Sequence, residues 1–112
     1  MADYPIPTGI PKVYSVNALS CSSTTVTAVA APASGKTIVL TGGDLGSTAL
    51  QQVNIVDAND STVLTPLKVN TSSAMFDLGS GIKLTAANDS IGLLMVGSGT
   101  PTLVGFLLGV EI

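Results

Sequence analysis

The stretch that decides the fold is residues 91–112, Ile-Gly-Leu-Leu-Met-Val-Gly-Ser-Gly-Thr-Pro-Thr-Leu-Val-Gly-Phe-Leu-Leu-Gly-Val-Glu-Ile. It carries a single charged side chain, Glu111, so nearly all of it has to be removed from water. Two structures would achieve this. One is a pair of buried β-strands, and the other is a membrane-spanning helix, since about twenty apolar residues are long enough to cross a bilayer.

Glycine and proline in the middle of this stretch favour the strands. Pro101 biases Thr100 towards extended geometry, and each glycine lowers helix stability by about 1 kcal/mol relative to alanine. No lysine or arginine flanks the stretch to orient a membrane helix. We therefore expect two strands of hairpin length around a turn at residues 97–101, with the membrane helix as the alternative.

The second of these strands is apolar on both faces. Its even positions form one continuous apolar face, which we assign to the core: Val104, Phe106, Leu108, Val110 and Ile112. The odd positions mix leucine with glycine, and glycine on an outer face indicates that another backbone approaches closely. Such a strand is buried on both sides, either within a two-layer core or also against another subunit. In the second case, the predicted subunit interface is Leu103, Gly105, Leu107 and Gly109.

The composition fits a single domain that associates with other chains. The 112 residues suffice for one domain that buries roughly two-thirds of its unfolded surface. Only 10% of the residues are charged, against about a quarter in soluble domains, and so little charge favours self-association. The net charge of -3 and the lack of arginine argue against a nucleic-acid-binding face.

The remaining sequence predicts short strands and turns, without sustained helical spacing. Runs of β-branched residues at 23–31 and 36–41 predict a hairpin, and the glycine-rich run 42–47 predicts a loop after it. Further strands are expected at 49–57, 62–69, 74–78 and 82–85. The tetrapeptide Ala-Asn-Asp-Ser occurs at 58–61 and again at 87–90, and both copies predict turns. The pattern is typical of an all-β protein, a single sandwich of about eight or nine short antiparallel strands.

Residues 1–12 predict an extended arm in front of a sandwich domain at residues 13–112. Closely spaced prolines hold the chain extended and remove backbone donors. The apolar and aromatic side chains between them suit a partner surface, and a frayed terminus is the alternative. The predicted docking residues are Tyr4, Pro5, Ile6, Pro7, Ile10, Pro11 and Tyr14.

Few residues point to chemistry. The lone Cys21 and the absence of histidine argue against a disulfide framework, a Cys/His metal cluster and the usual general base, so we expect neither an enzyme nor a cofactor. Asp57, Asn59 and Asp60 miss the spacing of a calcium loop and are better explained as a turn. The run Ser-Gly-Lys-Thr at 34–37 lacks the first glycine of a phosphate-binding loop. The N-terminus lacks the pattern of a signal peptide, so folding in the cytoplasm is expected.

Three passages resemble a known family. They are Pro-Ala-Ser-Gly-Lys-Thr-Ile-Val-Leu-Thr-Gly at 32–42, Ile-Lys-Leu-Thr-Ala-Ala-Asn-Asp-Ser-Ile-Gly-Leu at 82–93 and Val-Gly-Phe-Leu-Leu-Gly-Val-Glu-Ile at 104–112. The pattern of residue types and the order of the expected strands over residues 23–112 resemble those of the small jelly-roll proteins of tailed-bacteriophage virions. These proteins include head decoration (cement) proteins and fibre or knob domains.

The resemblance implies a structural virion protein. It would bind the outer capsid surface as a homotrimer, clamp neighbouring major capsid proteins and stabilise the lattice, without nucleic-acid or membrane partners. The alternatives are a receptor- or carbohydrate-binding knob of a phage tail or fibre, and a small membrane protein. The knob is disfavoured by a shortage of aromatic residues, because Phe106 is assigned to the core face.

Overall fold

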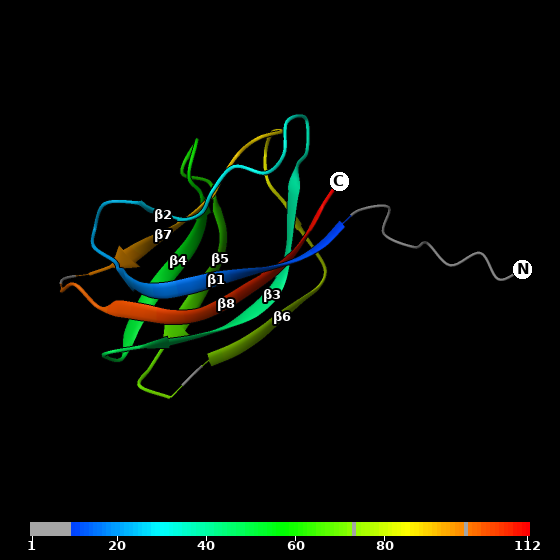
Figure 1. Cartoon of the computed structure of the whole chain (residues 1–112). Coiled ribbons are helices and arrows are strands. Elements are labelled where there is room, and N and C mark those ends of the chain that lie inside the picture. The colour runs from blue at the N-terminus through cyan, green and yellow to red at the C-terminus, as the bar shows by residue number, and fades with distance from the viewer. Residues whose placement is uncertain (1–9, 73, 98) are drawn as a thin grey trace, which may run out of the picture.

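The computed structural model describes residues 10–72, 74–97 and 99–112, which form two antiparallel β-sheets packed face to face (Figure 1). The strands are β1 (Ile10–Ser20), β2 (Val26–Val29), β3 (Ile38–Ser47), β4 (Gln51–Asp57), β5 (Val63–Val69), β6 (Ala74–Lys83), β7 (Ile91–Val96) and β8 (Thr102–Glu111). Sheet A has the strand order β1-β8-β3-β6, and sheet B has the order β2-β7-β4-β5. The expected all-β class with two antiparallel sheets is confirmed.

The strands pair from the two ends of the chain inward. β1 pairs with β8, β2 with β7, β3 with β6 and β4 with β5. The chain is therefore one long folded-over ribbon whose middle is the turn between β4 and β5. The additional pairs β3 with β8 and β4 with β7 join the ribbon segments into the two sheets.

The inner faces of the two sheets enclose one apolar core. Burying these side chains is the main favourable contribution to folding, at about 25 cal/mol per Å² of apolar surface. The fully buried members of the core with the largest side chains are Ile38, Leu40, Leu45, Ile55, Leu84, Ile91, Leu93, Leu103 and Leu107.

The stretch at 91–112 forms strands, as expected, but the two strands do not pair with each other. β7 lies in sheet B and β8 in sheet A, so the turn between them crosses from one layer to the other. The predicted hairpin at 23–41 is wrong for the same reason, because β2 and β3 lie in different sheets. No helix in the described part of the chain is long and apolar enough to cross a membrane.

Two glycine-rich runs, one predicted as a loop and the other left between two predicted strands, lie within strands. The run 42–47 continues β3, and the run 79–81 lies inside β6, where Thr41 opposes residues 78–81 in a bulge. The glycines of β3 serve close strand packing instead of a turn. A Cβ added at Gly42 would lie 2.7 Å from the backbone oxygen of Phe76 on the neighbouring strand.

The two faces of β8 are the reverse of the prediction. Leu103 and Leu107 are fully buried in the core, whereas Val104 is 55% exposed and Leu108 is 36% exposed. The predicted subunit interface therefore faces the chain's own core. Its two glycines do allow close approach, but the group that approaches belongs to the same chain. A Cβ at Gly105 would collide with the backbone oxygen of Asp44, and one at Gly109 would lie 3.0 Å from the ring of Tyr14.

The N-terminal strand begins earlier than predicted. β1 starts at Ile10, whose backbone pairs with Glu111, and Pro11 pairs with Val110. The remaining residues of the predicted arm, Tyr4, Pro5, Ile6 and Pro7, lie outside the described residues.

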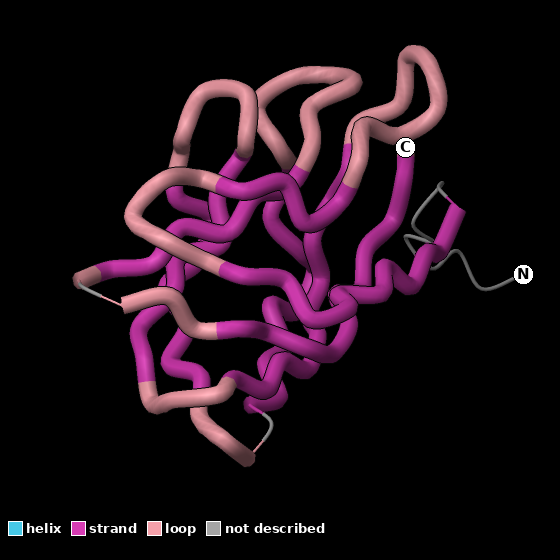
Figure 2. Tube along the Cα trace, turned by 60° about the vertical axis from the view of Figure 1, so that its left-hand side comes forward, coloured by secondary structure: helices cyan, strands magenta, loops and turns pink. Residues whose placement is uncertain are grey.

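The loops of residues 30–37, 58–62 and 84–90 gather at one end of the sandwich (Figures 1 and 2). Hydrogen bonds join them: the Asn88 backbone N–H donates to the Lys36 carbonyl at 2.8 Å, and the Ala58 N–H donates to the Ser90 carbonyl at 2.9 Å. This end brings together the two copies of Ala-Asn-Asp-Ser, which both occupy turns, as predicted.

Candidate functional site

The outer face of sheet A is apolar, although it is turned away from the core. We define this outer face by its exposed members Val13 on β1, Met75 on β6, and Val104, Leu108 and Ile112 on or just after β8. Met75 is 81% exposed and Val13 is 68% exposed. An antiparallel sheet with one solvated face normally carries polar residues there. Sheet A instead carries five large exposed apolar side chains on this face, beside polar residues such as Asp44 and Asp77.

The register of the sheet makes these side chains neighbours. Val13 pairs with Leu108 across β1 and β8. Asp44 of β3 pairs with Phe106 on one side and with Met75 on the other, so these three residues form a row across β8, β3 and β6. Phe106 is half-buried on the outer face, which corrects its assignment to the core face. The result is a patch of apolar side chains in which Asp44 lies between Phe106 and Met75.

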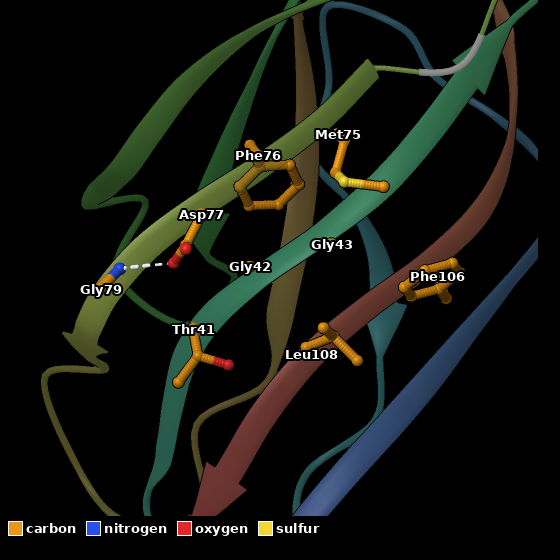
Figure 3. Close-up of a pocket in the computed structure, with 9 residues that line it drawn as sticks. All are labelled: Thr41, Gly42, Gly43, Met75, Phe76, Asp77, Gly79, Phe106 and Leu108. Atoms are coloured by element: carbon orange, nitrogen blue, oxygen red, sulfur yellow. Dashed lines mark hydrogen bonds between the residues drawn. The ribbon is translucent and has the colours of Figure 1, made fainter.

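A pocket of about 320 Å³ lies in this face over β3. Phe76 and Met75 come from β6 and Phe106 and Leu108 from β8, and they surround Gly42 and Gly43 of β3 (Figure 3). The two glycines leave the pocket open between these larger side chains. At the rim, Asp77 Oδ1 accepts a hydrogen bond from the Gly79 N–H at 2.8 Å, which fixes the start of the bulge. The pocket suits an apolar side chain or a ring.

One polar atom in the outer face has no partner among the described residues. Asp44 Oδ1 is buried and accepts no hydrogen bond. A buried acceptor in this state destabilises the protein by about 1–3 kcal/mol. A donor from a molecule that covers the face would remove this penalty.

A second cluster lies at the loop end of the sandwich and contains three carboxylates. Oxygen atoms of Asp57, Asp60 and Asp89 lie within 4.8 Å of one another. The Thr85 hydroxyl lies between them, 2.8 Å from Asp57 Oδ2 and 3.1 Å from Asp89 Oδ2, and it also contacts Asp60. The Thr85 and Asn59 backbone N–H groups donate to Asp57 at 3.1 and 2.9 Å.

The carboxylates titrate differently because they are hydrogen-bonded to one another. The pKa of Asp89 is raised, first by its hydrogen bond to Asp57 and then by burial. Burial acts to raise the pKa of Asp57, but hydrogen bonds from Asp89, the Asn59 N–H and Thr85 outweigh it and lower that pKa. The Thr85 hydroxyl and the Thr62 N–H lower the pKa of Asp60. The coupling between these two carboxyl groups therefore favours the protonated form of Asp89 and the charged form of Asp57.

Carboxylate oxygens at this spacing are also of the kind that bind Ca²⁺ or Mg²⁺. From the sequence, Asp57, Asn59 and Asp60 were explained as a turn in preference to a calcium site, and Asp89 was not grouped with them. The repeated tetrapeptide was the signal that could have found it, because each copy supplies one aspartate, at positions 60 and 89. The copies contact each other directly, since the Ser90 N–H donates to Asn59 Oδ1 at 3.0 Å.

Tyr14, predicted to dock on a partner, is half-buried on the edge strand β1 and bonds to its own chain. Its hydroxyl donates to Glu111 Oε2 at 2.9 Å, and its half-buried ring lies over Gly109. Burial raises the pKa of Tyr14, and the neighbouring Glu111 carboxylate raises it further. Of the described arm residues, Pro11 is exposed on β1 and remains able to contact a partner.

Comparison with known proteins adds no homologue: no family model, curated protein or solved structure matches the chain. The outer face and the acidic cluster are the two chemical features from which a function can be argued. The outer face is the larger of the two features. In a single copy it leaves apolar side chains exposed to water and Asp44 Oδ1 without a hydrogen bond from the described residues.

Proposed function

We propose that this protein is a non-catalytic structural protein of a tailed-phage virion, which binds the outer surface of the capsid as a homotrimer and stabilises the lattice. The observation that carries the proposal is the apolar outer face of sheet A on a chain with only 10% charged residues. Such a face is typical of a protein that works inside an assembly. The major capsid protein is the proposed partner.

The strand order supports a jelly-roll topology for the sandwich. In a jelly roll, eight strands form two Greek keys in two sheets, an architecture shared by viral capsid and lectin domains. The pairs β1 with β8, β2 with β7, β3 with β6 and β4 with β5 follow this winding.

Two observations support a non-catalytic role. Burial raises the pKa of the Cys21 thiol to about 11, so this cysteine is not a thiolate at neutral pH. Of the described residues that line the pocket, Asp77 alone is ionisable, and its Oδ1 is engaged by the Gly79 N–H.

Capsid binding is tested by co-sedimentation with capsids of the virus that encodes the chain. The full chain is compared with a variant that lacks residues 1–9, in which β1 is kept intact. We expect the full chain to sediment with capsids, and the shortened chain to keep its oligomeric mass but lose most of the binding. Full-chain protein that stays in the supernatant would refute the proposed function. Unchanged binding of the shortened chain would refute the docking arm alone.

A receptor- or carbohydrate-binding knob is the second candidate, and the pocket favours it. The rings of Phe76 and Phe106 both line this cavity, and aromatic faces suit sugar rings and apolar groups. A glycan array with the wild type and Phe106→Ala would test it. A signal that the substitution abolishes would establish this candidate, and no signal would remove it.

A further inference from the structure

We infer that the outer face of sheet A is the contact between copies of this protein, and that apolar side chains of a second copy fill the pocket over Gly42 and Gly43. The inference rests on the proposed homo-oligomeric state and locates its contact. The proposed contact residues are the exposed residues of the outer face. The interface predicted from the sequence included Leu103 and Leu107, which are buried in the core.

The first argument is the distribution of exposed apolar side chains. The described residues include eight large exposed hydrophobic side chains, at positions 13, 50, 63, 75, 96, 104, 108 and 112. Five of these eight belong to the outer face, although sheet B presents an outer face as well. Concentration of apolar groups on one sheet face distinguishes a contact surface from scattered surface hydrophobics.

The second argument is size. Each strand of sheet A has 10 or 11 residues. Four strands about 4.8 Å apart, with a rise of about 3.3 Å per residue, present a flat area on the order of 600 Å². This is of the same order as the roughly 800 Å² that each partner contributes to a standard protein interface.

The third argument concerns which partner covers the face. Homodimer interfaces are more apolar than the rest of the protein surface, whereas non-obligate contacts with separate partners are only about as apolar as that surface. A chain with 10% charged residues would associate through this face as soon as it folds, and a second copy is always available then. Interface cores pack as densely as protein interiors, so the pocket would be filled by the facing copy.

Two matched double variants test the inference by light scattering. Val13→Glu with Met75→Glu places two charges on the outer face. Leu50→Glu with Val63→Glu is the control, because Leu50 is as exposed as Val13, at 68%, and both control positions lie outside sheet A. We expect the outer-face variant to have the mass of one chain, and the wild type and the control to share a higher mass. A wild type with the mass of one chain, or an outer-face variant that keeps the wild-type mass, would overturn the inference.

Methionine oxidation tests the same contact without a substitution. In a single copy Met75 is 81% exposed and Met95 only 3% exposed. If a second copy covers the face, peroxide should oxidise Met75 in purified wild type about tenfold more slowly than free methionine, because sulfoxide formation follows exposure. Oxidation of Met75 at the rate of free methionine would overturn the inference.

The two tests separate this inference from the proposed function. Protection of Met75 in purified protein that does not bind capsids would support the contact between copies and refute the capsid-binding proposal. Protection that arises only after capsids are added would support capsid binding and show that the capsid, instead of a second copy, covers the outer face.

Discussion

At the scale of single residues, two carboxylates of the loop end, Asp89 and Asp60, change the stability of the fold with pH in opposite directions. A raised pKa, as at Asp89, stabilises the folded protein below the pKa of the unfolded chain, and this stabilisation is lost as the pH rises through the folded value. A lowered pKa, as at Asp60, stabilises it above the unfolded value and is lost as the pH falls. A substitution of Asp60 can therefore serve as the control for a substitution of Asp89.

The substitution Asp89→Asn replaces a carboxyl group whose pKa is raised with an uncharged amide that can donate to Asp57 at every pH. We expect its thermal midpoint at pH 7 to equal or exceed that of the wild type by a few degrees, and the difference to vanish towards pH 4. The control Asp60→Asn should lower the midpoint at pH 7. Circular dichroism melts between pH 4 and 8 measure both. A drop for Asp89→Asn, together with stabilisation of the wild type by Ca²⁺, would show that the cluster binds a cation and contradict this prediction.

The hydrogen bond between Tyr14 and Glu111 gives a second prediction. Tyr14→Phe leaves the nearly buried Glu111 carboxylate without this donor. Urea unfolding at pH 7 should show a loss of about 1–3 kcal/mol in the free energy of unfolding. The raised pKa of Tyr14 stabilises the fold below about pH 10 and this contribution falls at higher pH, so the deficit of the variant should shrink in alkaline solution. A deficit that is independent of pH would contradict the role of the hydroxyl.

At the scale of the elements, the sequence predicts which segments are strands better than it predicts what they touch. The strands at 91–96 and 102–111 follow from apolar runs bounded by glycine and proline. Their partners do not follow, because the ribbon winding pairs segments far apart in the chain. The sequence also does not predict which face of β8 points to the core. A strand that is apolar on both sides has no alternation of apolar and polar residues to indicate its inward face. Asp89 was missed because, although the repeated tetrapeptide marks its position, only the fold shows that the two copies meet beside Asp57.

Two adjacent substitutions on β8 test its orientation. Leu107→Ala should lower the free energy of unfolding by about 2–5 kcal/mol, because it opens a cavity in the core. Leu108→Ala, on the outer face, should cost less than about 1 kcal/mol within a single copy and act mainly on oligomeric mass. Denaturant unfolding at low protein concentration separates the two effects. The opposite ranking would restore the even positions of β8 to the core.

At the scale of the whole molecule, the low charge determines how the assembly should respond to salt. An oligomer held by ion pairs weakens as ionic strength rises, because the Debye length falls from about 14 Å at 0.05 M to about 3 Å at 1 M. The outer face is instead apolar, and burial of apolar surface is strengthened by salts such as sulfate. We therefore expect the mass of the wild type to stay constant in sodium chloride between about 0.05 M and 1 M, and its dissociation on dilution to require lower protein concentrations in sulfate. Light scattering over a dilution series measures both. Dissociation by sodium chloride would mean that charged side chains hold the copies together, and the contact would then have to be sought around Lys12, Lys83 and Asp77 at the edges of sheet A.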